Sequence, residues 1–183
     1  MICGAKGVGK DTVAKYFINN HGYERLAFAD KLKDVCSLLF DIDREIFDDP
    51  ILKEKEIIGW EKSPRRIMQF IGTEIFQEKI NELFPFLNKC FWAIDIKKKI
   101  INSKSDNFVI SDLRFIHELE IFSDMKPFII KVVNNKQNDS LHTSELEYNN
   151  IIHNIIVHND GDVDELYEKL KNISQIIEDY QKC

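Results

Sequence analysis

Apolar residues follow two different spacings along this chain. Residues 10–20 place apolar side chains three and four positions apart, which predicts a helix with one buried face, and the His21-Gly22 pair behind them is typical of a helix end. Short unbroken apolar runs are typical of buried strands instead. Strands are therefore expected over residues 1–3, 23–29, 107–111, 128–133 and 151–157.

Helical patterns separate these strands. Asp30 is placed to open a helix that runs to about Phe40. Ser63-Pro64 has the residue types preferred at an N-cap and at the first helical position. Asp162 or Asp164 would cap the last helix. Helices are expected over residues 30–40, 65–80, 91–101, 115–124 and 162–180.

The alternation of strands and helices predicts an α/β fold with a parallel sheet and helices on both faces. Residues 41–104 contain no expected strand, and their first part, 41–62, is charge-dense and irregular. We expect a single domain over residues 1–183, with a core at about 1–40 and 105–183 and a helical insertion at about 41–104.

Composition narrows the function classes. The chain has 183 residues, 44% of them hydrophobic and 31% charged, which excludes wholesale disorder. Its formal net charge of −6 argues against a nucleic-acid partner, whose binding surface would be basic. The four cysteines have neither disulfide-framework nor zinc spacing. With no long apolar stretch to cross a membrane, a cytoplasmic location is expected.

The segment GAKGVGKD, residues 4–11, matches the spacing G-x-x-x-x-G-K between an expected strand and an expected helix. In such a loop, backbone N–H groups converge on a phosphate, and the helix N-terminus adds positive charge. Lys10 would bridge the β- and γ-phosphates of ATP and neutralise charge during transfer. The sequence therefore predicts a P-loop phosphotransferase.

One position departs from the usual pattern, in which serine or threonine follows the lysine and its hydroxyl meets Mg²⁺. Here Asp11 follows, with Thr12 next. A carboxylate is a stronger magnesium ligand than a hydroxyl, so Asp11 is expected to hold Mg²⁺ directly or through water. Thr12 is placed to hydrogen-bond the α-phosphate. A fortuitous glycine-rich turn is the alternative that the motif's short length leaves open.

Basic residues elsewhere could hold a phosphorylated acceptor. Lys33 follows the second expected strand, Arg65 and Arg66 begin the helix after Pro64, and Arg114 follows the third strand beside Asp112. Arginine presents a fork of donors that matches a phosphate. Arg65 and Arg66 could equally pair with surface carboxylates, and Asp112 could pair with Arg114 or hold a magnesium-bound water.

These motifs together resemble a known family. The order GKDT, LKD, RRIMQFIGTE, D-x-R, HTSE and HNDG is similar to that of the deoxynucleoside monophosphate kinases of bacteriophages and large DNA viruses. The resemblance runs from Gly4 to about Asn172 and is weakest at 41–62 and 80–105. It implies an adenylate-kinase-like P-loop fold that transfers the γ-phosphate of ATP, assisted by Mg²⁺, to a deoxynucleoside monophosphate (dNMP). It leaves monomer and homodimer open.

The resemblance also implies roles for single residues. Residues 134–150, with His142 and Glu145, would form a short lid. Asn159, Asp160 and Gly161 fall where adenine is expected, although they could be only a turn and a helix cap. Asp112 and Arg114 would lie near the transferring phosphate, with Asp112 a magnesium ligand beside Asp11. The residues implied for ATP and Mg²⁺ are Gly4, Lys6, Gly7, Gly9, Lys10, Asp11 and Thr12, and those for the acceptor are Lys33, Arg65, Arg66, Gln69 and Thr73.

Two other functions compete with this one. Animal-type phosphomevalonate kinases share a GKD loop and a D-x-R after a strand, and would use the same chemistry on an isoprenoid phosphate. The helix RRIMQFIGTE, whose Gln69 could read a base edge, favours the nucleotide. A non-catalytic nucleotide-binding module is the second alternative, and the basic residues at 33, 65, 66 and 114 argue against it.

Overall fold

A parallel sheet forms the centre of the first of two units into which the chain divides. The computed structural model describes residues 1–134 and 147–182. The first unit comprises Met1–Ala27 and Ile96–Cys183, and the second comprises Phe28–Asp95. The boundary falls between Ala27 and Phe28 and again between Asp95 and Ile96.

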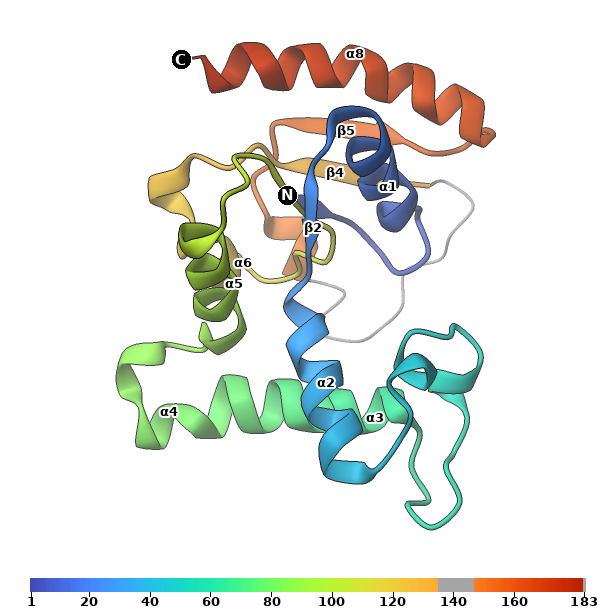
Figure 1. Cartoon of the computed structure of the whole chain (residues 1–183), viewed down its shortest axis with the longest axis vertical. Helices are drawn as coiled ribbons and strands as arrows, with labels where there is room; N and C mark the ends of the chain where they lie inside the picture. Colours follow the sequence, from blue (N-terminus) through green and yellow to red (C-terminus); the bar gives the residue numbers. More distant parts are fainter. Residues whose placement is uncertain (135–146, 183) are drawn as a thin grey trace. The chain divides into compact units, whose positions relative to one another are not determined.

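The described residues of the first unit form five short parallel strands, of which β2, β4 and β5 are labelled in Figure 1. One set of ladders has the order β1-β4-β5 and a second pairs β2 with β3. Leu113, just beyond β3, forms a parallel bridge with Cys3 of β1 and joins the two sets into the order β2-β3-β1-β4-β5. The strands are β1 (Ile2–Cys3), β2 (Glu24–Leu26), β3 (Phe108–Ile110), β4 (Ile130–Val133) and β5 (Ile155–His158).

Two helices of the first unit bury their apolar faces against this sheet. α1 and α8 contact each other, and both contribute to one core cluster with the strands. Gly22 ends α1 in a left-handed conformation and Asp162 caps α8, as the sequence predicts. Lys97 Nζ of α5 donates to the Ile121 carbonyl just after α6, 2.8 Å away. The helices are α1 (Lys10–His21), α5 (Phe91–Asn102), α6 (Ile116–Glu120) and α8 (Val163–Gln181).

The second unit consists of helices and turns. α2 packs closely on the segment after α3, because a Cβ on Gly72 would lie within 3.0 Å of the Leu32 side chain. Trp92 Nε1 donates to the Gly72 carbonyl at 3.1 Å, so Gly72 is held from two sides. Its elements are α2 (Phe28–Phe40), α3 (Pro64–Gln69), η3 (Phe70–Lys79), α4 (Ile80–Leu83) and the 3₁₀ turns η1 (Arg44–Phe47), η2 (Leu52–Glu54) and η4 (Pro85–Leu87).

Several predicted elements differ from the structure. The strand expected over 23–29 ends at Leu26, because α2 begins at Phe28, and the helix expected over 115–124 ends at Glu120. The helix over 65–80 forms, but η3 makes up most of it and is a π-helix, in which the Gly72 carbonyl accepts from the Trp92 indole. α2 begins at Phe28, which makes Asp30 a first-turn residue that favours the helix dipole instead of a cap. The strand predicted over 151–157 begins only at Ile155, because residues 147–150 form the 3₁₀ turn η6 and the Ile151 N–H bonds back to the Tyr148 carbonyl.

The remaining predictions of the sequence concern cysteines and membranes. Cys3, Cys36 and Cys90 are buried free thiols, and burial raises the pKa of Cys36 to about 11. In the described part of the chain, every helix is too short or too polar to reach across a bilayer.

Candidate phosphate-binding site and its neighbours

The loop at residues 4–11, called the phosphate loop, links β1 to α1. Gly4, Gly7 and Gly9 all have positive φ angles, which an L-residue rarely adopts. Gly9 occupies the N-cap position of α1 and has no side chain, so the first N–H groups of the helix receive no bond from an N-cap side chain. This backbone suits an anion, because N–H groups and the helix dipole combine at one place.

Lys10 lies within the same loop. Its Nζ donates to the carbonyls of Gly4 at 2.9 Å and Ala5 at 2.6 Å. The ammonium group is therefore held over the turn whose N–H groups suit a phosphate. A cation in this position neutralises charge on bound phosphate oxygens.

Asn159, at the end of β5, braces the phosphate loop. Its side-chain Nδ2 donates to the Val8 carbonyl at 2.8 Å, and its backbone carbonyl accepts from Asn134 Nδ2 at 2.7 Å. A Cβ on Gly9 would lie within 3.0 Å of this amide group, so glycine at position 9 is also required by Asn159. The resemblance assigned Asn159 to the adenine region, and in the structure its side chain contacts the loop.

Gly4→Ala is expected to destabilise the fold by about 3 kcal/mol or more. The new Cβ would lie within 3.0 Å of the Val132 carbonyl in β4, and the φ angle of 142° would be strained in addition. Gly22→Ala is the matched control, because Gly22 has a φ of 66° but nothing within 4 Å of a new Cβ. It should cost only about 1 kcal/mol. Urea unfolding measures both, and equal losses would contradict this assignment.

The Asp-Leu-Arg segment, residues 112–114, lies beside the phosphate loop. The Leu113 N–H donates to the Ile2 carbonyl at 3.2 Å, and Leu113 is fully buried. Asp112 is half-buried and Arg114 is exposed. The structure therefore places a carboxylate and a guanidinium at the carboxyl edge of β3, next to the strand that leads into the loop. Ligands of open parallel sheets bind at this edge.

Two carboxylates of this region have the chemistry of magnesium ligands. Asp11 is exposed in the first turn of α1, and Asp112 follows β3. Magnesium keeps several waters and phosphate oxygens and takes only one or two protein carboxylates. This donor set fits the ion.

The three candidate basic residues of the second unit, Lys33, Arg65 and Arg66, are held by carboxylates. Lys33 Nζ lies 2.7 Å from Asp48 Oδ1, in a network that Arg44 shares. Arg65 Nε lies 2.5 Å from Glu54 Oε1, and Arg66 Nη1 lies 3.0 Å from Glu74 Oε1. Ser63 caps the helix that carries both arginines by accepting from the Arg66 N–H. The surface pairing that the sequence left open for the two arginines is therefore present.

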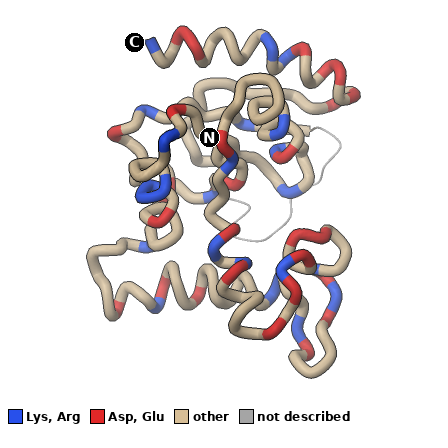
Figure 2. The backbone as a smooth tube through the Cα atoms, viewed as in Figure 1, with Lys and Arg blue, Asp and Glu red and all other residues tan. Residues whose placement is uncertain are grey.

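Charges of both signs alternate through residues 41–62 (Figure 2). Gln69 ends α3, and Thr73 lies in the π-helical segment η3, both half-buried. These five candidates for the acceptor site, Lys33, Arg65, Arg66, Gln69 and Thr73, thus belong to one unit. Residues 135–146 of the predicted lid, with His142 and Glu145, lie outside the described residues.

Sequence reasoning missed Glu118. This glutamate is buried in the first turn of α6, and its carboxyl contacts the backbone of the Asp-Leu-Arg segment. Only half of a signal was available: a glutamate at the third helical position can accept the N-cap N–H, but the N-cap is Phe115 and not the serine or threonine of a full capping box. The pattern could not show that the side chain is buried.

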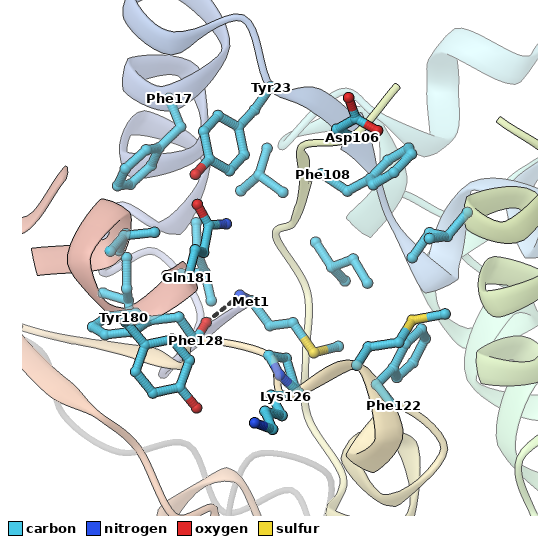
Figure 3. A pocket seen from close by; sticks show the side chains of 18 of the residues that line it. Met1, Phe17, Tyr23, Asp106, Phe108, Phe122, Lys126, Phe128, Tyr180 and Gln181 are labelled. Carbon is cyan, nitrogen blue, oxygen red and sulfur yellow. Dashed lines mark hydrogen bonds between the residues drawn. The ribbon is translucent and has the colours of Figure 1, made fainter. Parts of the chain in front are cut away.

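A cavity of about 420 Å³ lies elsewhere in the first unit (Figure 3). It is lined by residues at the amino ends of β1, β3 and β4, so it faces away from the phosphate loop. The Met1 amine donates to the Phe128 carbonyl at 2.6 Å on its wall, and burial lowers the pKa of this amine to about 5. The cavity is apolar at most positions, including Phe17, Phe108 and Phe122.

Comparisons with known proteins point to one enzyme class. A family model described as deoxynucleotide monophosphate kinase matches residues 51–170, which include the Asp-Leu-Arg segment. A relative from Acanthamoeba polyphaga mimivirus, provisionally assigned the same activity, is 29% identical over 180 residues and 92% of each chain.

Phage proteins give shorter matches. The deoxynucleotide monophosphate kinase of Enterobacteria phage T4 is 31% identical over 117 residues, or 63% of this chain and 46% of the relative. The deoxynucleoside-5'-monophosphate kinase of Escherichia phage T5 is 26% identical over 153 residues, or 75% and 56%. The chain thus spans about half the length of these phage relatives and nearly all of the mimivirus one.

Proposed function

Because the chain belongs to the deoxynucleotide monophosphate kinase family, we propose that it transfers the γ-phosphate of ATP to a dNMP and forms the diphosphate. The observation that carries this proposal is the pairing of β1 with the Asp-Leu-Arg segment. That pairing sets Leu113, which precedes Arg114, beside Cys3, which precedes the phosphate loop, and so supports a role for Lys10 and Arg114 at one phosphoryl group. A phosphoryl group in transfer spreads negative charge over its oxygens, and cations on two sides stabilise it.

In this proposal the phosphate loop binds the ATP phosphates. The backbone N–H groups of Gly7 and Gly9 and the N-terminus of α1 face the phosphates, Lys6 and Thr12 add contacts, and Lys10 neutralises the β- and γ-oxygens. Asp11 and Asp112 would hold Mg²⁺. That ion, bound to the phosphates, supplies charge neutralisation on the transferring group.

The second unit would bind the acceptor. Most of this unit, Phe28–Asp95, falls within the helical insertion predicted at about 41–104. Lys33, Arg65 and Arg66 each lie in an ion pair with at least one partly exposed member. Such pairs are worth only about 0–1 kcal/mol, so a phosphate dianion can displace the carboxylates. Gln69 and Thr73 would then contact the base. We also propose that residues 134–150 form the lid over the phosphates, as the resemblance implies.

A turnover panel tests the proposed function. The four dNMPs, the corresponding NMPs and phosphomevalonate are each supplied with ATP and Mg²⁺, and ADP release is measured. Turnover of at least one dNMP, with none of phosphomevalonate, is expected. Release of ADP only with phosphomevalonate would favour the isoprenoid alternative, and tight ATP binding without turnover of any monophosphate would favour a non-catalytic module.

Arg65→Ala and Arg66→Ala test the acceptor site. At least one is expected to raise the KM for the dNMP about 10- to 100-fold, because a hydrogen bond to a charged group contributes about 1.5–3 kcal/mol. The KM for ATP should stay unchanged. Steady-state kinetics with each substrate varied in turn measures both values.

Glu54→Ala is the matched control for Arg65→Ala. It breaks the same ion pair but leaves the guanidinium in place, so it should not raise the acceptor KM. If Glu54→Ala and Arg65→Ala raise it equally, the pair is structural. If neither arginine variant changes it, α3 does not belong to the acceptor site.

A further inference from the structure

Glu118 is a buried acid whose carboxyl is hydrogen-bonded to the backbone. Its side chain is almost fully enclosed, with the residue 4% exposed. Its Oε2 accepts the backbone N–H of Arg114 at 3.0 Å and that of Phe115 at 3.1 Å. One carboxyl oxygen therefore holds two successive peptide groups.

The same segment is held from its other side by the sheet. The Leu113 N–H donates to the Ile2 carbonyl, and Leu113 bridges to Cys3. Three successive N–H groups, at residues 113, 114 and 115, are thus fixed, the first by β1 and the next two by Glu118. The Cα of Arg114 lies between these anchors, so the direction in which its side chain leaves the backbone depends on both.

A helix cap alone does not require a buried acid. Asp162 caps the longer helix α8 by accepting the Glu165 N–H at 2.9 Å, and it does so from an exposed position. Burial disfavours the ionised form of Glu118 and, together with the nearby Asp112 charge, raises its pKa to about 8. The two backbone N–H bonds and the Arg114 charge act in the opposite direction, but they are outweighed. The carboxyl of Glu118 also does more than cap α6, because it accepts from Arg114 as well as from the N-cap residue Phe115.

We propose that Glu118 is a positioning residue, whose carboxyl fixes the backbone from which Arg114 reaches the transferring phosphoryl group. The proposal rests on the proposed function, in which Arg114 stabilises the charge of that group. Misplacing a catalytic group by about 1 Å can cost about a hundredfold in rate. Loss of the Glu118 contacts should therefore reduce kcat through Arg114, with substrate binding little changed.

A double-mutant cycle separates positioning from capping. Glu118→Ala should lower kcat about 10- to 100-fold, with both KM values within about twofold. In an Arg114→Ala background the same change should lower kcat less than about twofold, because the group it positions is gone. An equal loss in both backgrounds would overturn the proposal.

Three more variants complete the test. Glu118→Gln keeps an acceptor oxygen on a side chain of the same length, so its kcat should stay within about threefold of the wild-type value. Glu118→Asp, one methylene shorter, replaces Glu118→Ala in the cycle if the latter fails to fold. Asp162→Ala is the matched control, because losing that cap should lower the Tm and leave kcat unchanged.

Hydrogen exchange of residues 112–116 gives a readout that needs no substrate. Glu118→Ala should speed exchange there at least about tenfold, with exchange in β4 and α8 unchanged. Unaltered exchange at 112–116 would overturn the proposal. The two proposals can fail separately. If the wild type turns over no monophosphate but Glu118→Ala still speeds exchange at 112–116, the proposed function is wrong, whereas the placement of this segment by Glu118 is supported.

Discussion

Lys10→Ala is expected to lower kcat by about 10³-fold or more, with the fold intact. The ammonium group lies over the phosphate loop, 2.9 Å from the Gly4 carbonyl and 2.6 Å from the Ala5 carbonyl. In the proposed mechanism it meets the charge that builds up on the transferred group, so its removal acts on the transition state more than on substrate binding. Single-turnover kinetics with ATP and the best dNMP of the panel measures the effect.

Lys15→Ala is the matched control for this experiment. Lys15 is exposed on the same helix, α1, outside the phosphate loop, so its loss should leave kcat unchanged. Thermal unfolding of both variants shows whether the two hydrogen bonds of Lys10 matter to stability. A Lys10→Ala protein with wild-type turnover would remove Lys10 from the mechanism.

Arg114→Ala is expected to lower kcat by about 10³-fold, with KM for ATP changed less than about threefold. An arginine that stabilises the transferring phosphoryl group is worth about 10³–10⁵ in rate. Arg114 is exposed, so its truncation should change the free energy of unfolding by no more than about 0.5 kcal/mol. Arg114→Lys, which keeps the charge but loses the planar fork, should recover only part of the rate.

The exposed Lys104 is the control for a general loss of positive charge. Lys104→Ala changes the net charge by the same amount on the same unit and should leave kcat unchanged. If Lys104→Ala and Arg114→Ala have the same small effect, Arg114 acts only through the overall field. The transition-state role would then belong to another cation.

Local patterns in the sequence predicted the elements that local physics decides. The helical spacing over residues 10–20 and the stop at Gly22 were confirmed, because glycine accepts the left-handed conformation that ends α1. Ser63 and Asp162 cap their helices as predicted, since both side chains accept N–H groups close by in the sequence. The family was also predicted correctly, from motifs whose residue types and order are themselves the signal.

Contacts between distant residues lay beyond these patterns. Nothing in the sequence around Leu113 or Cys3 predicts the bridge between them, which joins the two ladders into one sheet. That bridge places the Asp-Leu-Arg segment beside the phosphate loop. Nor does the sequence show that Asn159 bonds the Val8 carbonyl, 151 positions away. Such pairings depend on which strands become neighbours.

The sequence by itself therefore determined the family and the residue types that it offers: a glycine-rich turn, a lysine and a set of arginines whose types suit phosphate. Only the tertiary structure decided what surrounds each group. It enclosed Glu118 against the Arg114 backbone and set Arg65 against Glu54, although both acids look like ordinary polar positions in the sequence. The physical reason is that burial and pairing belong to the packed chain, whereas propensity and motif belong to neighbouring residues.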